Sequence, residues 1–184
     1  MVIIITASPN TDGLTAACGQ AALEGVIVAG HEAEIIDISA MKLEPCRVCS
    51  DGWGTCRTQS QCVCRDCLAE IRGKIRSCDG MIMVTPVYFG QPSERMKFFM
   101  DRFRRCEAFN PSGSAAAGKR ADLIAAAGGS GNGTATCLCE MEMWCRHVGA
   151  IPAERVCVTR FNRQEALNLI RNAGGQYASS IQNR

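Results

Sequence analysis

Cysteine is the residue type that could do the most chemistry in this chain. Six of its thirteen cysteines fall within the twenty-two residues from Cys46 to Cys67, which read CRVCSDGWGTCRTQSQCVCRDC. Polar residues and glycine surround these thiols. Six free thiols on such a loop would be exposed to oxidation, and metal ligation would remove that liability. The stretch therefore predicts a metal ion or an iron–sulfur cluster, because thiolates suit both zinc and iron–sulfur centres.

Disulfides are the least favoured alternative for these cysteines. Thirteen thiols cannot pair completely. The N-terminal residues MVIIITASPN have no charged region and only a short apolar run, which argues against a secretory signal and predicts a buried strand. We therefore expect a cytoplasmic protein in a reducing compartment, where thiols stay free or bind metal.

Cysteines outside this stretch are expected to be small core residues, because they lie in apolar segments. They are Cys18, Cys78, Cys106 and Cys157. In CLCEMEMWC, residues Cys137, Met141 and Cys145 recur at a spacing of four and predict a buried helical face.

Other polar residues carry weaker signals. Arg102, Arg104 and Arg105 are expected to form a solvated helix face, and His31 and His147 are expected at the surface. No catalytic acid or base is predicted.

Length and charge limit the classes of function. A chain of 184 residues with 47% hydrophobic content can bury one sizeable core, which predicts a single domain over residues 1–184. A net charge of +2 predicts no nucleic-acid partner. No apolar run approaches the ~18 residues of a membrane span, so we expect no membrane association.

Apolar runs alternate with segments of helical period, the pattern of a parallel sheet covered by helices on both faces. Strands are predicted at Val2–Thr6, Ala33–Ile38, Gly80–Thr85, Ala121–Ala127 and Arg155–Thr159. Helices are predicted at Leu14–Ala29, Cys67–Ser77, Ser93–Cys106, Thr134–Val148 and Arg163–Ser179. The cysteine-rich stretch, residues 45–67, is then an insertion between the second strand and the second helix.

The loop after the first strand, TASPNTDGLT, leaves backbone N–H groups free at the start of a helix. Such a turn suits a phosphate dianion, because the helix N-terminus supplies partial positive charge and unpaired donors. The alternative is an ordinary helix N-cap by Asp12 or Ser8.

Two further loops fall at the carboxyl edge of the sheet, where open parallel sheets bind their ligands. TPVYFGQPS offers Tyr88 and Phe89 to flank a planar ring, with Gly90 allowing close backbone approach. The alternative, inward packing of the rings, is somewhat favoured by the sequence for either ring taken singly. GGSGNGT lacks side chains that would keep a flat ligand away from the backbone, and its alternative role is a mobile connection.

The segments TASPNTDGLT, TPVYFGQPSERMKFFMDR and AAGGSGNGT resemble the three flavin-contacting regions of the flavodoxin-like NADPH-dependent FMN reductase family. The resemblance covers nearly the whole chain. It implies a three-layer α/β flavodoxin-like fold with a five-stranded parallel sheet of order 2-1-3-4-5, and FMN as cofactor. The implied phosphate contacts are Ser8, Asn10, Gly13, Leu14 and Thr15. The implied isoalloxazine contacts are Pro86, Val87, Tyr88, Phe89, Gly90, Gly128, Gly129, Ser130 and Gly131.

LEPCRVC followed by further cysteines and CVCRD is similar to the iron–sulfur flavoprotein branch of that family, which implies a [4Fe–4S] cluster. The implied ligands are Cys46, Cys49, Cys56 and Cys62. Zinc stays open as an alternative metal, and Cys64 or Cys67 stays open as a replacement for Cys56, although Cys67 falls at the start of a predicted helix.

These expectations describe an oxidoreductase that moves electrons between FMN and a [4Fe–4S] cluster. The expected redox partner is a nicotinamide nucleotide, a ferredoxin or a quinone, and a homodimer or homotetramer could bring cluster and flavin of neighbouring subunits together. One alternative is an NAD(P)H-dependent FMN or quinone reductase with structural zinc or no metal. Another is a flavin-free metal-binding or redox-sensing module.

Overall fold

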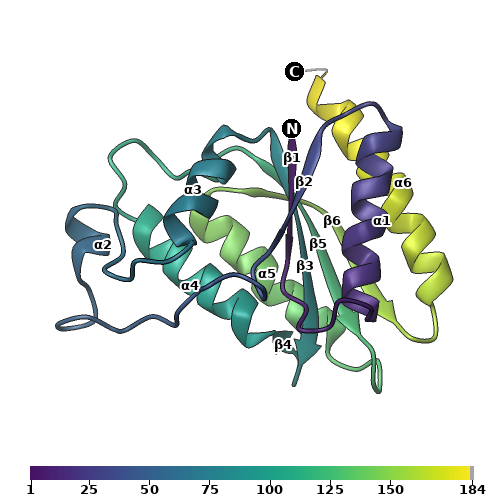
Figure 1. The fold of residues 1–184 in the computed structure, drawn as a ribbon, viewed down its shortest axis with the longest axis horizontal. Coiled ribbons are helices and arrows are strands. Elements are labelled where there is room, and N and C mark those ends of the chain that lie inside the picture. Colours follow the sequence, from purple (N-terminus) through teal and green to yellow (C-terminus); the bar gives the residue numbers. More distant parts are fainter. Residues whose placement is uncertain (183–184) are drawn as a thin grey trace.

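A parallel sheet forms the centre of the protein (Figure 1). The computed structural model describes the backbone of residues 1–182 and the side chains of residues 1–176. The main strands, in their spatial order, are β2 (Ala33–Asp37), β1 (Val2–Thr6), β3 (Gly80–Tyr88), β5 (Arg120–Ala127) and β6 (Ile151–Thr159). Counted without the short β4, this is the predicted order 2-1-3-4-5, so the flavodoxin-like fold is confirmed.

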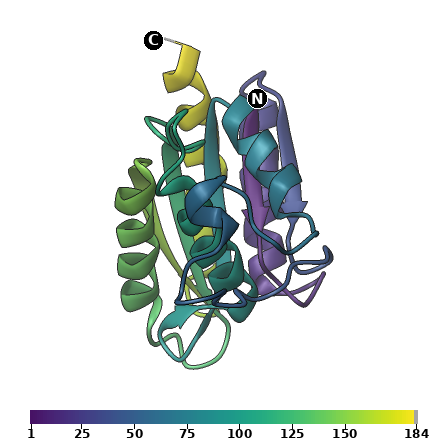
Figure 2. The ribbon, with the colours of Figure 1, turned by 90° about the vertical axis from the view of Figure 1, so that its left-hand side faces the viewer.

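Helices cover both faces of the sheet, as Figures 1 and 2 show. One face is covered by α1 (Leu14–Val28) and α6 (Arg163–Gln182). The other is covered by α3 (Leu68–Ser77), α4 (Glu94–Glu107) and α5 (Thr134–Val148). A single turn, α2 (Thr55–Thr58), lies inside the cysteine-rich insertion and was not predicted.

The side chains of each strand alternate between the two faces of the sheet and build two hydrophobic cores. Ile3 and Ile5 pack with α3, α4 and α5, whereas Val2 and Ile4 pack with α1 and α6. Successive strand side chains point to opposite faces, so an unbroken apolar run fills both layers. The predicted buried face of α5 is confirmed, since Cys137, Met141 and Cys145 are fully buried.

The carboxyl end of β3 is longer than predicted. Its last residues pair antiparallel with β4 (Gln91–Pro92), which joins Val87 to Pro92 and Tyr88 to Gln91. This hairpin holds the TPVYFGQPS loop at the end of the sheet, where the ligand-binding edge was predicted.

The prediction that Cys157 is a core residue is wrong. Cys157 is exposed because β6 is an edge strand with incomplete helical cover. Cys18, Cys78 and Cys106 are buried as expected. Among the residues that the structure describes, no helix combines the length and the apolar character needed to cross a bilayer.

Candidate functional site: a phosphate-accepting edge and a cysteine cavity

The first helix begins without a side-chain cap. Its N-cap residue is Gly13, which makes no side-chain cap hydrogen bond, and its first turn holds no acidic residue. The alternative of an N-cap by Asp12 or Ser8 is therefore wrong. The backbone N–H groups of this turn, together with the helix dipole, form an arrangement that favours an anion.

A hollow of about 370 Å³ lies beside this helix start, and we call it the phosphate hollow. Ser8, Asn10 and Gly13 line it, as predicted for residues of one site. The Ser8 hydroxyl donates to the Asn10 carbonyl at 2.7 Å, which fixes the turn. The side chains of Leu14 and Thr15 do not line this hollow; Leu14 packs against the core and Thr15 is buried, so these residues offer backbone N–H groups.

The sequence interpretation missed Asp37 at the end of β2, which also lines the phosphate hollow. Its carboxylate accepts from the Ser39 backbone N–H at 2.9 Å. The carboxyl end of β2 lies beside that of β1, since Thr6 pairs with Asp37. The sequence signal that could have revealed Asp37 is its position: it is a polar residue at the end of the second predicted strand, which neighbours the first in the expected sheet order.

A second hollow, of about 400 Å³, joins the loop after β1 to the loop after β3. Ser8 and Tyr88 both line it, together with Ser93 at the start of α4. The Ser93 backbone N–H donates to the Thr85 hydroxyl at 3.1 Å, and the Ser93 hydroxyl donates to the Ala7 carbonyl at 3.3 Å. These buried hydrogen bonds hold the two loops in a fixed relationship.

The aromatic rings of the second loop do not pack into the core. Phe89 is fully exposed and Tyr88 is 38% exposed. Pro86 and Val87 before them are half-buried. Both rings are therefore available to a planar ligand at the carboxyl edge of the sheet.

The third loop is open on its backbone side. A Cβ atom placed on Gly128 or Gly129 would meet no atom within 4 Å, and Ser130 is exposed. Gly131 lies near Thr159 at the end of β6. Neither this loop nor Pro86, Val87, Phe89 or Gly90 is among the described residues that line the two hollows. The loop and these four residues border the same edge of the sheet but line neither hollow.

The four predicted cysteine ligands line one cavity, although they are spread over seventeen residues of the loop. Cys46, Cys49, Cys56 and Cys62 all contribute to it, and we call it the cysteine cavity. Cys64 and Cys67 do not line it. The space that it encloses is small, about 20 Å³.

Two arginines and a fifth cysteine from α4 complete the cysteine cavity. They are Arg102, Arg105 and Cys106. The prediction that Arg102 belongs to a solvated face is wrong, because its side chain is 1% exposed. The signal was present: Phe99, Arg102, Phe103 and Cys106 recur at i, i+3, i+4 and i+7, the spacing of a buried helical stripe.

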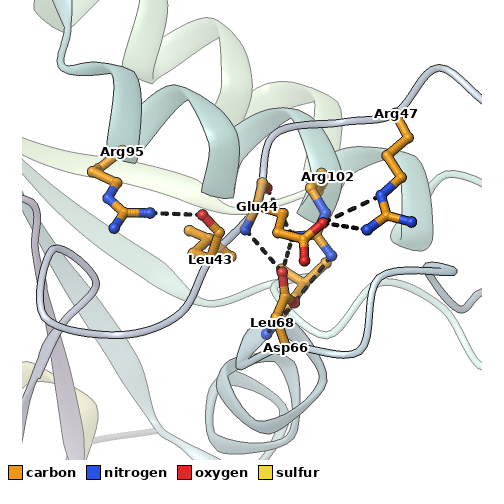
Figure 3. Close-up of polar contacts among 7 residues, drawn as sticks. All are labelled: Leu43, Glu44, Arg47, Asp66, Leu68, Arg95 and Arg102. Atoms are coloured by element: carbon orange, nitrogen blue, oxygen red, sulfur yellow. Dashed lines mark hydrogen bonds and ion pairs between the residues drawn. The ribbon is translucent and has the colours of Figure 1, made fainter.

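Arg102 forms a buried ion pair with Asp66 (Figure 3). Its two terminal nitrogens donate to the two Asp66 oxygens at 2.5 and 3.0 Å. Burial works against charge on both side chains. The hydrogen bonds from Arg102 and from two backbone N–H groups nevertheless hold the pKa of Asp66 below its usual value, and the contacts with Asp66 and Cys62 raise the pKa of Arg102.

Arg105 and an aromatic pair hold the outer part of the cysteine-rich insertion, residues 45–67, which we call the cysteine loop. Arg105 donates to the Gly52 carbonyl, and its guanidinium lies 4.9 Å from the centre of the Trp53 ring. Trp53 in turn meets Phe109 edge-on at 5.3 Å. These contacts tie the segment between Cys49 and Cys56 to α4 and to the loop that follows it.

Backbone strain gathers at the two candidate sites. Within residues 1–182, four residues other than glycine adopt positive φ. They are Val48, Ser50, Ser60 and Phe89. The first three lie in the cysteine loop and the fourth in the loop after β3. Such conformations cost free energy and are typical of ligand-binding segments.

The thiols do not form a compact site for one ion. Among the residues described, no three His, Cys, Asp or Glu side chains stand close enough together to hold a single metal ion. Burial raises the pKa of the Cys64 thiol to about 11 and that of the Cys106 thiol to about 12, which keeps both protonated at neutral pH.

Comparisons with known proteins identify a family and relatives for the chain. The family model for NADPH-dependent FMN reductases matches residues 1–162. An iron–sulfur flavoprotein of Methanocaldococcus jannaschii is 36% identical over 103 residues, which are 56% of this chain and 51% of that protein. An iron–sulfur flavoprotein of Methanosarcina thermophila is 39% identical over 82 residues, 45% of this chain and 41% of that protein. The matched segment spans about half the length of these curated relatives or less.

Solved structures show the same fold at low sequence identity. An NAD(P)H:quinone oxidoreductase from Methanothermobacter marburgensis superposes with a TM-score of 0.72 at 18% identity, covering 95% of this chain and 94% of that one. RosB with a bound riboflavin phosphate intermediate gives a TM-score of 0.77 at 12% identity, covering 99% and 80%.

Proposed function

Because the chain belongs to the NADPH-dependent FMN reductase family of oxidoreductases, we propose that it is an iron–sulfur flavoprotein. FMN binds at the carboxyl edge of the sheet, and a [4Fe–4S] cluster binds in the cysteine cavity. The observation that carries the proposal is the convergence of Cys46, Cys49, Cys56 and Cys62 on one cavity, separate from the phosphate hollow. The names of the relatives from Methanocaldococcus jannaschii and Methanosarcina thermophila support it.

The carboxyl edge fits FMN. The uncapped start of α1 would hold the phosphate through the backbone N–H groups of Leu14 and Thr15, with Ser8, Asn10 and Gly13 around it. Residues 86–90 and 128–131 would flank the isoalloxazine with two exposed aromatic rings and open glycine backbone. When bound, FMN supplies both hydride and single-electron chemistry, and the protein orients it and limits its contact with water.

The donor set of the cysteine cavity fits an iron–sulfur cluster better than zinc. Zinc needs four sulfurs at about 2.3 Å from one point. The described side chains offer no such compact group. A cluster of several irons spreads its ligands farther apart, and the positive charge of Arg105 compensates part of the negative charge of thiolate ligands.

Helix α4 connects the two sites. Ser93 and Glu94 at its start line the second hollow, while Arg102 and Cys106 near its end line the cysteine cavity. Twelve residues separate Glu94 from Cys106, about 18 Å along a helix.

We propose that a homodimer or homotetramer brings the cysteine cavity of one subunit near the flavin edge of another. A nicotinamide nucleotide, a ferredoxin or a quinone exchanges electrons with the protein.

Anaerobic purification followed by metal analysis and spectroscopy tests the function. We expect FMN, iron and acid-labile sulfide together, with absorption that dithionite bleaches by more than two electrons per flavin. Flavin with zinc or without metal would instead indicate a reductase that lacks a cluster. Metal without flavin, even after incubation with FMN, would indicate a metal-binding or redox-sensing module. Sedimentation that shows only monomers would contradict the proposed assembly.

A further inference from the structure

Arg102 ties together the two ends of the cysteine loop (Figure 3). One terminal nitrogen donates to the Glu44 carbonyl at 2.9 Å, just before Cys46. Both terminal nitrogens donate to Asp66, just after Cys64. Asp66 accepts in addition from the backbone N–H groups of Glu44 at 2.9 Å and Leu68 at 3.2 Å. One ion pair therefore fixes the start of the loop at Glu44 and its end at Asp66, next to the start of α3.

One donor of Arg102 has no acceptor in this network. Its Nε atom is buried and makes no hydrogen bond among the residues described. A buried N–H without a partner costs free energy, so such a group in a folded protein calls for an explanation. Arg102 also lines the cysteine cavity and interacts with Cys62. A sulfur atom bound in that cavity is an acceptor of the right kind.

We propose that Arg102 is a positioning residue for the cluster. It closes the cysteine loop through Asp66 and Glu44, and its Nε–H is placed to donate to a sulfur of the bound cluster or of a cysteine ligand. This inference rests on the proposed function. A fixed positive charge and an N–H bond to sulfur both stabilise the more negative, reduced form of a cluster, so Arg102 raises its reduction potential.

Two substitutions separate positioning from charge. Arg102→Lys keeps the positive charge but loses the two-pronged contact and the Nε donor. Asp66→Asn removes the negative charge and keeps an oxygen acceptor. Arg104→Lys is the matched control, because Arg104 lies on the same helix and lines a different hollow, on the side of α5. A purely structural role predicts that both ion-pair variants shift the potential in the same direction.

The test uses the full chain with its cluster reconstituted anaerobically, and dithionite as reductant in a redox titration followed by electron paramagnetic resonance. We expect the midpoint potential to fall in R102K, to rise in D66N and to stay unchanged in R104K. Iron retention against a chelator should weaken by about 10- to 100-fold in R102K. Equal potentials in R102K and the wild type, or a fall in both R102K and D66N, would overturn the inference.

A second measurement does not need the cluster. In metal-free protein, amide hydrogen exchange over residues 44–67 should accelerate in R102K and D66N but not in R104K. Unchanged protection in both ion-pair variants would overturn the loop-closing role. Wild-type protein that binds no iron would instead refute the proposed function itself, so the two failures are distinguishable. If R102K does not fold, the direction in which the midpoint potential shifts in D66N still tests the proposed role of Arg102: a rise supports it and a fall overturns it.

Discussion

Gly133 lies against Gly90 so closely that a Cβ atom at Gly133 would stand 2.6 Å from the Gly90 Cα atom. Gly90 ends the turn after β3, and Gly133 is the N-cap of α5. This contact brings the loop after β3 and the loop after β5, the second and third loops predicted to bind a ligand, together at the carboxyl edge of the sheet. A side chain at Gly133 does not fit against the Gly90 backbone, whereas a Cβ atom at Gly90 would meet no atom closer than 3.8 Å.

Gly133→Ala should therefore damage this edge. Gly133 has a φ of +83°, which an alanine adopts only with strain, and the added methyl group meets backbone that cannot swing away. We expect a loss of about 1–3 kcal/mol in the free energy of unfolding and weaker FMN binding. Urea unfolding and fluorescence titration with FMN measure the two effects. Gly118→Ala is the control, since its φ is +72° but its Cβ position is open; equal effects in both variants would contradict the contact argument.

Ala16→Asp tests whether the start of α1 holds a phosphate. Ala16 lines the phosphate hollow in the first turn of the helix. A carboxylate there suits the helix dipole and should leave stability equal or slightly higher, yet it repels a bound phosphate by about 1–4 kcal/mol at a separation of ~4 Å. We expect FMN affinity to fall about tenfold or more, with Ala16→Asn nearly unaffected. Unchanged affinity in the aspartate variant would place the phosphate elsewhere.

Single serine substitutions test the ligand set of the cysteine cavity. Replacing Cys46, Cys49, Cys56 or Cys62 should each remove most of the iron, because each lines the cavity. Replacing Cys64 or Cys67 should leave the iron content near that of the wild type. Iron and sulfide are measured per chain after anaerobic reconstitution, and FMN content serves as the internal control for folding. Loss of iron in Cys64→Ser with retention in Cys56→Ser would reassign the ligand.

Asp122 predicts a pH dependence of stability that is unrelated to either site. It is buried in β5, and burial raises its pKa from 3.8 to about 6, although its carboxylate accepts the Glu154 N–H at 3.1 Å. The unfolded chain loses this proton first as the pH rises, so the contribution of Asp122 to stability decreases between about pH 4 and pH 6 and is then constant.

Asp122→Asn removes this titration. Because one pKa unit corresponds to about 1.4 kcal/mol, the variant should be more stable than the wild type by up to about 3 kcal/mol above pH 7 and by little near pH 4. Urea unfolding at pH 4, 6 and 8 measures the difference. A gain that is the same at all three values would show that packing, and not charge, causes it.

The sequence by itself determined the fold class and the layout of the chain. Unbroken apolar runs such as VIIIT are typical of strands buried on both faces, and the helical segments between them supply that cover. Helix Thr134–Val148 agrees with its predicted bounds because its apolar period and its flanking glycines both mark it. The density of cysteines in one polar loop likewise predicted a metal ion or cluster there, and the resemblance to iron–sulfur flavoproteins implied four of them as its ligands.

Only the tertiary structure decided what surrounds those cysteines. The spacing of Phe99, Arg102, Phe103 and Cys106 marks the buried side of α4, but local sequence does not reveal that Asp66, 36 residues earlier, pairs with Arg102 there. The exposure of Cys157 depends on β6 lying at the sheet edge, a property of strand order and not of the strand's own residues. Contacts between segments far apart in the chain set burial and charge pairing, and composition and periodicity describe one segment at a time.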